Sequence, residues 1–180
     1  MNTEYEIRIL NVDVDNVVNM LEDMGAKKIG SYNQRRYVYD IMPNQSDKFI
    51  RVRDNGEVVT ITYKDKTIRT ISGTKELEMV VSDFDKANEL LNILGYNNGH
   101  YVENRRITYE LEDAEFDIDT YPGIPTYMEI EGKDEETVNK YIDLLKLNDN
   151  EQTCDSLFKV YARYGLDISD KRDLVFKEGK

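Results

Sequence analysis

The sequence predicts an α+β fold in which eight antiparallel strands close into a β-tunnel, with helices packed outside it and further helices at the carboxyl end. Three observations support this prediction. Part of the chain repeats at an offset of 70 residues, the separation of Asp13 from Asp83. Polar and apolar residues alternate along the segments interpreted as strands, and the charges on those strands are segregated by sign. We therefore expect two similar β-α-β-β-β halves.

The length of 180 residues suits a single domain, 1–180, with internal halves at about 1–66 and 70–132 and a helical segment at about 134–180. No apolar run approaches the ~20 residues that a membrane span requires, and the first residues lack the pattern of a secretion signal. We expect a cytoplasmic protein that does not enter membranes.

The charge and the reactive side chains exclude several classes of function. With 36 acidic against 24 basic residues, the net charge of −12 opposes binding to nucleic acid or to an anionic membrane. Cys154 has no partner thiol, and His100 is the only histidine. A structural thiol and a loop histidine are the simplest interpretations, so neither residue receives a functional role.

The helices are predicted from apolar residues at helical spacing. The segment from Asp13 to Gly25 and the segment from Asp83 to Gly95 each begin with an aspartate that can cap the first turn and end in a glycine suited to a left-handed cap. Two further helices are expected near 134–147 and 153–164. The internal repeat therefore includes one helix in each half.

The strands are predicted from alternation and from turn residues. The turn Asp54-Asn-Gly-Glu57 is typical of a tight hairpin, and Tyr121-Pro-Gly-Ile-Pro125 interrupts pairing before the last strand. The expected strands lie near 3–10, 29–40, 48–54, 57–65, 70–82, 101–111, 114–120 and 126–132.

Charged residues occupy one face of several strands, and most of these strands carry one sign of charge. On a single strand this pattern usually means a face in water, but its recurrence on six strands favours a closed sheet with the charged face inward. Carboxylates and arginines around one lumen suit a complex of a divalent metal with a polyphosphate. The charged positions are Glu4, Glu6, Arg8, Arg51, Arg53, Glu76, Glu78, Asp117, Asp119, Glu129 and Glu131.

An ordered set of motifs over nearly the whole chain resembles the CYTH superfamily, the triphosphate tunnel enzymes, and the tail from Val160 to Asp167 resembles its bacterial class IV adenylate cyclase branch. The matching motifs are Glu4-Tyr-Glu6-Ile-Arg8, Phe49-Ile-Arg51-Val-Arg53, Thr62-Tyr-Lys64, Lys75-Glu-Leu-Glu78, Arg105-Arg106-Ile-Thr-Tyr109, Asp117-Ile-Asp119-Thr-Tyr-Pro and Tyr127-Met-Glu129-Ile-Glu131-Gly132.

The resemblance implies an enzyme that acts on a triphosphate with Mg²⁺ or Mn²⁺. The implied triphosphate-binding residues are Arg8, Arg51, Arg53, Lys64 and Arg106, with Arg36 as an additional candidate from the internal repeat. The implied metal ligands are Glu4, Glu6, Glu129 and Glu131, supported by Asp119. Glu76 and Glu78 are expected either beside the arginines as counter-charges or as further metal ligands, and Lys64 and Arg8 are the expected catalytic cations.

Two departures from the family pattern leave the reaction open. Arg8 replaces the signature lysine, and Asn104 stands where a lysine often precedes the arginine of the basic strand. Arginine keeps its proton and cannot act as a base. Hydrolysis of tripolyphosphate, a nucleoside triphosphate or thiamine triphosphate is the first hypothesis. A class IV adenylate cyclase and a non-catalytic nucleotide or polyphosphate binder are the alternatives, and a homodimer is left open.

Overall fold

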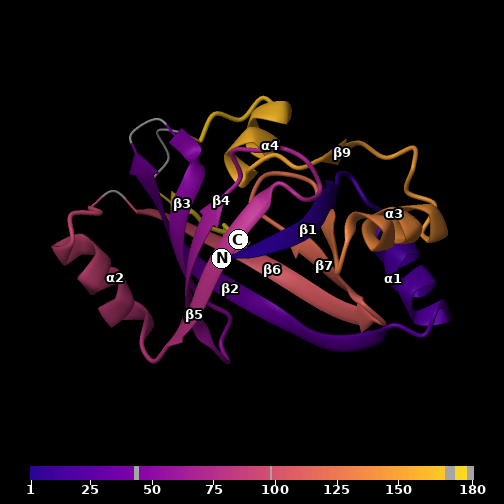
Figure 1. The fold of residues 1–180 in the computed structure, drawn as a ribbon, viewed down its shortest axis with the longest axis horizontal. Helices are drawn as coiled ribbons and strands as arrows, with labels where there is room; N and C mark the ends of the chain where they lie inside the picture. Colours follow the sequence, from indigo (N-terminus) through magenta and orange to yellow (C-terminus); the bar gives the residue numbers. More distant parts are fainter. Residues whose placement is uncertain (43–44, 98, 169–172, 178–180) are drawn as a thin grey trace.

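The structure is a computed structural model that describes residues 1–42, 45–97, 99–168 and 173–177 (Figure 1). Eight strands form the barrel: β1 (Asn2–Ile9), β2 (Lys27–Met42), β3 (Gln45–Asp54), β4 (Val59–Asp65), β5 (Thr74–Val81), β6 (His100–Leu111), β7 (Ala114–Thr120) and β8 (Tyr127–Gly132). Around them lie α1 (Val14–Asp23), α2 (Phe84–Ile93), α3 (Glu135–Leu144), α4 (Leu157–Arg163) and the two-residue strands β9 (Gln152–Thr153) and β10 (Asp173–Leu174).

The barrel closes as the sequence predicts. The strands follow the order β6-β2-β3-β4-β5-β1-β8-β7, every neighbouring pair is antiparallel, and β7 pairs with β6 to complete the ring. β9 adds to β1, and β10 runs parallel to β6. The seam between β1 and β5 is short, from Asn2 opposite Glu76 to Glu4 opposite Thr74, whereas β2 pairs with β6 from Lys27 to Val38.

The barrel is polar inside and apolar outside. On β1 the side chains of Glu6 and Arg8 line the interior cavity, while Ile7 and Ile9 belong to a buried apolar cluster on the outer face. That cluster joins the outer faces of β1, β6, β7 and β8 to α1 and α3. A second cluster joins α4 to Tyr121 and the strand ends, and a third lies beneath α2.

Aspartate caps begin three of the helices. Asp13, Asp83 and Asp134 each accept a hydrogen bond from a backbone N–H of the first turn, as N-cap residues do. Gly25 and Gly95 follow α1 and α2 with φ of +83° and +102°, the left-handed backbone that glycine adopts without strain. The repeated helix with its glycine cap is therefore confirmed in both halves.

The two largest differences from the predicted boundaries are at the starts of α4 and β5. The helix expected over 153–164 begins only at Leu157, because Thr153 pairs with Arg8 on β1. The strand expected from residue 70 begins at Thr74, after a turn in which the Gly73 N–H donates to the Thr70 carbonyl. In the described part of the chain, no helix is both long and apolar enough to cross a membrane.

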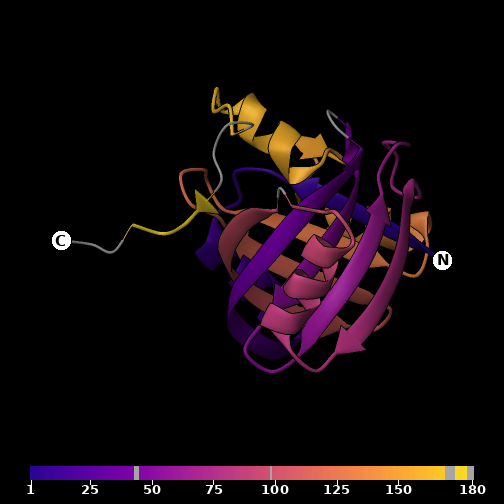
Figure 2. The same ribbon diagram turned by 90° about the vertical axis from the view of Figure 1, so that its left-hand side faces the viewer.

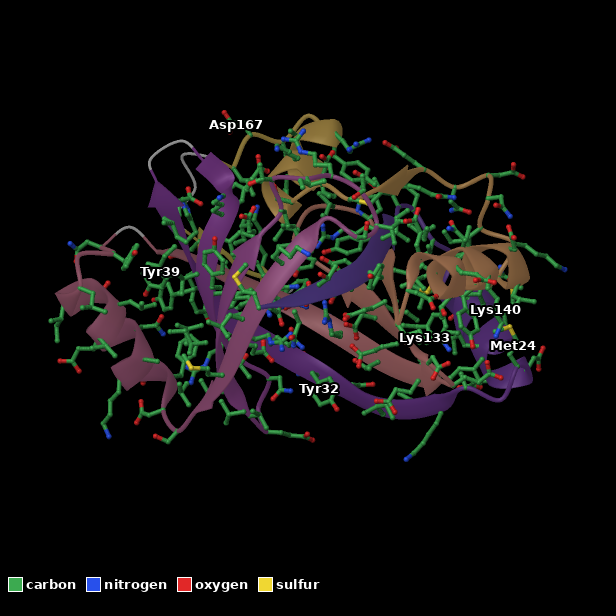
Figure 3. The ribbon with its side chains drawn as sticks, in the orientation of Figure 1. Met24, Tyr32, Tyr39, Lys133, Lys140 and Asp167 are labelled. Carbon is green, nitrogen blue, oxygen red and sulfur yellow. The ribbon has the colours of Figure 1, made fainter. Side chains whose placement is uncertain are left out.

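The helices are distributed unevenly around the barrel. Figure 1 shows α1 and α3 together on one side and α2 by itself on the other, and Figure 2 shows α4 across the top. In Figure 3, Lys133, Lys140 and Met24 lie on the α1 and α3 side, whereas Tyr39 points toward α2. The Tyr39 hydroxyl donates to Asn88 Oδ1 at 2.8 Å and so ties β2 to α2.

Candidate active site

A cavity of about 350 Å³ occupies the interior of the barrel, within the range of small-molecule sites. Side chains from all eight barrel strands line it. In the ring, β2 and β3 lie opposite β1 and β8. Because β2 and β3 contribute arginines and β1 and β8 contribute mainly glutamates, the cavity has a basic wall and an acidic wall facing each other.

The basic wall places like charges next to one another. Arg36 on β2 lies directly opposite Arg53 on β3, with Arg51 two residues along the same strand. Repulsion from Arg51, followed by burial, lowers the pKa of Arg53 to about 9. Adjacent cations cost free energy unless an anion neutralises them. The protein therefore carries an unbalanced positive cluster on one wall of the cavity.

Several arginine N–H groups around the cavity have no hydrogen-bond partner among the described residues. Among the described residues, the Nε atoms of Arg8, Arg36 and Arg51 are buried and make no hydrogen bond. Arg36 donates to Gln34 Oε1 at 2.5 Å and to Asn104, which itself donates to Asp119 at 2.8 Å. Unsatisfied buried donors are uncommon in proteins and indicate a site for an acceptor such as a phosphate oxygen.

Two lysines pair with glutamates of the cavity. Lys64 Nζ lies 2.8 Å from Glu4 and 3.0 Å from Glu76, and Lys66 Nζ lies 2.6 Å from Glu6. Burial opposes the charge on Lys64, but Glu6 and Glu4 outweigh it, so the pKa of Lys64 is raised above its ordinary value. Lys64 therefore stays protonated at neutral pH and acts as a cation.

The acidic wall contains a row of carboxylates. Glu6 on β1 is paired with Glu131 on β8, which is paired with Glu115 on β7. Within the described residues, no cation lies within ion-pair distance of Glu131, and burial followed by the nearby glutamates raises its pKa to about 7 although Lys64 opposes this. Burial, reinforced by Glu6 and Glu76 and opposed by Lys64, raises the pKa of Glu4 to about 8.

Glu129 is held by cations from two strands. Arg8 lies 2.5 Å from one oxygen of Glu129, and Arg106 lies 3.0 Å from the other. Although burial opposes it, these two arginines lower the pKa of Glu129 to about 2. Arg106 also pairs with Asp117 and Asp119. Asp119 lies behind Arg106, fully buried and outside the lining of the cavity, so it contacts the site through that arginine.

The donor set of the acidic wall fits a hard divalent cation. Carboxylate oxygens are the ligands that Mg²⁺ and Mn²⁺ prefer, and a cation near Glu4 and Glu131 would relieve the burial of like charges. Over the described ranges no three acidic, cysteine or histidine side chains already converge on one point. Glu4, Glu6 and Glu129 instead bind lysine or arginine, so an incoming metal would exchange with these cations.

One part of the cavity is apolar. Phe49 on β3 and the α4 residues Leu157 and Phe158 belong to the lining. The ring of Phe158 packs edge-on against His100, with 5.3 Å between ring centroids. The lining thus offers an organic group a wall of hydrocarbon beside the arginines of β2 and β3.

The structure brings most of the expected residues to one cavity. Arg36 and Arg106 line it, as the repeat predicts, while Arg35 pairs with Asp54 on the surface and Arg105 stacks on Phe176. The other expected residues in the lining are Glu4, Glu6, Arg8, Arg51, Arg53, Lys64, Glu76, Glu78, Glu129 and Glu131. Glu76 contacts Lys64 at 3.0 Å, and Glu78 lies 3.4 Å from Arg51, as expected of counter-charges.

Sequence reasoning missed Lys66, Glu115 and the α4 residues. Lys66 lies just past the end of β4, but its side chain faces the same way as that of Lys64 and is buried. Extending the alternation by one step would have identified it. Glu115 precedes Asp117 and Asp119 on the same face of β7, so the same rule applies. No sequence signal connects α4 to the cavity.

Comparisons with known proteins agree with this architecture. A Methanocaldococcus jannaschii protein with the provisional name adenylate cyclase MJ0240 is 29% identical over 136 residues, covering 71% of this chain and 75% of its own. The PH1012 protein from Pyrococcus horikoshii superimposes with a TM-score of 0.72 at 26% identity, covering 82% of this chain and 94% of its own. A conserved hypothetical protein from Pyrococcus furiosus gives a TM-score of 0.72 at 18% identity, covering 86% and 98% of the two chains.

The family follows from the match over most of the chain. The CYTH domain matches residues 2–156, which contain the complete barrel and every charged residue of the two walls described above. Met1, α4 and the residues after α4 lie beyond the matched range. This chain belongs to the CYTH domain family.

Proposed function

We propose that this protein is a metal-dependent triphosphate hydrolase, with residues 1–180 acting as one domain. The observation that carries the proposal is the basic wall, where buried arginines repel one another and leave donors unpaired. A chain of phosphates supplies both the negative charge and the oxygen acceptors that this wall lacks. The 29% identical relative is named as an adenylate cyclase, and enzymes of that name act on a triphosphate substrate.

The binding roles follow from position in the cavity. Arg36, Arg51 and Arg53 would bind phosphate oxygens from the basic wall, and Lys64 and Arg106 would bind them from the sides. Arg8 would contribute charge beside Glu129. The proposed metal ligands are Glu4, Glu6, Glu129 and Glu131, with Mg²⁺ or Mn²⁺ as the metal and Asp119 orienting Arg106.

Catalysis would depend mainly on charge and alignment. A bound divalent metal would supply Lewis acidity toward phosphate oxygens. The cations of this chain would neutralise the charge that spreads over the transferred phosphoryl group while water attacks phosphorus and the remaining phosphates leave. Lys64 would stay protonated throughout, in keeping with its raised pKa, so its catalytic role would be electrostatic, as would that of Arg8.

The apolar part of the cavity favours an organic triphosphate over inorganic tripolyphosphate. Phe49, Leu157 and Phe158 have no polar group to offer a phosphate, but they suit a nucleobase or the rings of thiamine. We therefore place nucleoside triphosphates and thiamine triphosphate ahead of tripolyphosphate as substrates.

Phosphate release tests the proposal directly. The purified protein is assayed with each of these triphosphates and Mg²⁺ or Mn²⁺, with Arg36→Met as the test variant and Arg35→Met as the matched control on the outer face of the same strand. We expect a loss of about a hundredfold or more in kcat/KM for Arg36→Met and little change for the control. Absence of turnover with every substrate and both metals would leave binding alone as the function.

The same cavity suits a second candidate, a class IV adenylate cyclase. Its support is the apolar wall, which can receive adenine, together with the name of the 29% identical relative. In that reaction the ribose 3′-oxygen attacks the α-phosphorus, pyrophosphate leaves and the hydroxyl proton is released. Separating the products of ATP decides between the two, because cyclic AMP with pyrophosphate indicates cyclisation and ADP with phosphate indicates hydrolysis.

A further inference from the structure

The two sides of the barrel are related by the internal repeat, but only one is fully covered. On the first side, α3 packs on the outer faces of β1 and β8, next to α1. The repeat relates β1 to β5 and α1 to α2, and β5 pairs with β4 as β1 pairs with β8. No helix lies between β4 and β5 in the sequence. Among the described residues, no helix therefore covers the corresponding outer face of β5 and its border with β4, which we call the uncovered bed (Figure 2).

The residues of the uncovered bed are apolar. Ile7 and Ile9 on β1 are 7% and 0% exposed, whereas their counterparts at the offset of 70, Leu77 and Met79, are 51% and 56% exposed. An apolar face in water is unfavourable and often marks an interaction surface. The outer face of β5 is thus as apolar as the buried outer face of β1, but no helix among the described residues covers it.

The helix beside this bed presents a matching apolar stripe. Leu90 and Ile93 of α2, together with Leu94, which caps the carboxyl end of this helix, follow helical spacing and are 54%, 75% and 64% exposed. The opposite flank of α2, with Asp85 and Asn92, lines a pocket with residues of β2. The apolar flank therefore faces β4 and β5.

The covered side shows what fits such a bed. Met20 and Met24 of α1, the counterparts of Leu90 and Leu94, pack in the cluster that contains Val138, Tyr141 and Ile142 of α3. The occupant of the uncovered bed should therefore be a helix with an aliphatic stripe, lying alongside α2.

We propose that this bed, defined by Leu77, Met79, Leu90, Ile93 and Leu94, binds α2 of a second copy of this chain. Turning one barrel over onto another about a two-fold axis places α2 of each protomer on the β4 and β5 face of its partner. The two α2 helices then lie side by side between the barrels, as α1 lies beside α3. A two-fold axis makes the contact reciprocal, so one surface serves both partners.

The size of the patch agrees with such a dimer. Five aliphatic side chains that are half to three-quarters exposed present on the order of 300–400 Å² of apolar surface. A standard interface takes about 800 Å² from each partner, of which more than half is apolar, so the patch supplies most of the apolar part and its rim would supply the remainder. The inference does not depend on the proposed hydrolase activity.

Sedimentation of the full chain from about 1 to 100 μM measures the association. We expect a monomer–dimer equilibrium for the natural sequence, weakened at least about tenfold by Ile93→Lys and by Met79→Glu. Leu144→Glu is the matched control, since Leu144 is an exposed leucine of α3 on the other side of the barrel. Circular dichroism and the melting temperature establish that each variant is folded.

A mixing experiment tests the geometry itself. Ile93→Lys and Met79→Glu, each monomeric alone, should form a heterodimer when mixed, because one contact then pairs lysine with glutamate and the other retains both natural residues. A natural chain that stays monomeric throughout the range would overturn the proposal. So would a dimer that both variants leave unchanged, or variants that do not associate on mixing. Triphosphate turnover is measured in parallel and has no bearing on this outcome.

Discussion

At the scale of single residues, the cavity holds charges that oppose stability in the absence of ligand. Arg53 lies opposite Arg36 and near Arg51, and its only described carboxylate neighbour within ion-pair distance, Glu78, is 3.6 Å away. Glu78 has a closer partner in the Thr62 hydroxyl, at 2.6 Å. Removing Arg53 would therefore relieve repulsion without leaving Glu78 unpaired.

Arg53→Gln should make the ligand-free protein more stable and its triphosphate complex weaker. Loss of the repulsion is expected to increase the free energy of unfolding by about 1 kcal/mol, which raises the melting temperature by roughly 2–4 °C. Tripolyphosphate affinity, measured by calorimetry, should fall about tenfold or more because a charged phosphate contact is lost. Arg35→Gln, on the outer face, should change neither quantity appreciably. A less stable Arg53→Gln protein would contradict the interpretation.

The glutamates of the acidic wall predict the pH dependence of the metal-free protein. The pKa of Glu131 is raised from 4.5 to about 7 and that of Glu4 to about 8, so the folded state binds more protons than the unfolded chain in this range. The stability that these groups contribute is present at the acid end and is lost as pH rises through their folded pKa values. The melting temperature should therefore decline as pH rises from about 4.5, the ordinary pKa of these groups, to about 8, the highest of their folded values.

Glu131→Gln provides the comparison for this pH series. The variant has no carboxyl group to deprotonate at that position, so its melting temperature should decline less steeply than that of the natural sequence. Mn²⁺ added at the alkaline end should restore stability to the natural protein and less to the variant, as expected of a lost ligand. Parallel slopes for the two metal-free proteins would show that Glu131 is not the group responsible.

At the scale of elements, α4 gives the cavity its apolar part and lies beyond the matched family range. The sequence predicts a helix here, but it places the start at residue 153 because composition does not reveal that Thr153 pairs with β1. Similarly, Lys66 follows the predicted strand by one residue, and the sequence alone does not show that its side chain turns into the cavity after the strand ends. In both places a contact with a distant part of the chain decides the outcome.

The apolar wall predicts a selective effect of Phe158. Phe158→Ala should raise KM for a nucleoside triphosphate about tenfold through lost burial, and leave KM for tripolyphosphate nearly unchanged because no phosphate contact is removed. Steady-state kinetics with both substrates measures the ratio. Phe176→Ala is the control, since it removes a ring that stacks on Arg105 outside the barrel. An equal change for both substrates would indicate a general disturbance of the cavity.

At the scale of the whole molecule, the two opposed walls arise from the order of the strands. Alternation within the sequence correctly indicates which side chains share a face, and Arg36 and Arg106 are placed correctly by the repeat. Alternation does not indicate which strands become neighbours. The row of Glu6, Glu131 and Glu115 depends on the pairing of β1 with β8, whose residues are more than 100 positions apart in the sequence, so it emerges only from the folded barrel.

Because every barrel strand contributes to the lining of the cavity, a bound triphosphate should stabilise the protein as a unit. At a tripolyphosphate concentration about 100 times its Kd, binding to the folded state increases the free energy of unfolding by about 2.7 kcal/mol. This corresponds to a rise of roughly 5–11 °C in melting temperature. Scanning calorimetry should show a single shifted transition. An unshifted transition under saturating ligand would mean that the phosphate binds the unfolded chain equally well, contrary to a site built by closure of the barrel.

The pairing of β1 with β8 has a consequence for the kinetics of folding. β1 is the first strand in the chain, yet it pairs with β8, which forms only from residues 127–132. Contacts between such distant segments carry a large loop-closure entropy and form late. An open sheet with its arginines already in place would therefore precede the closed barrel, and a polyphosphate that binds this sheet would guide the final strand into position.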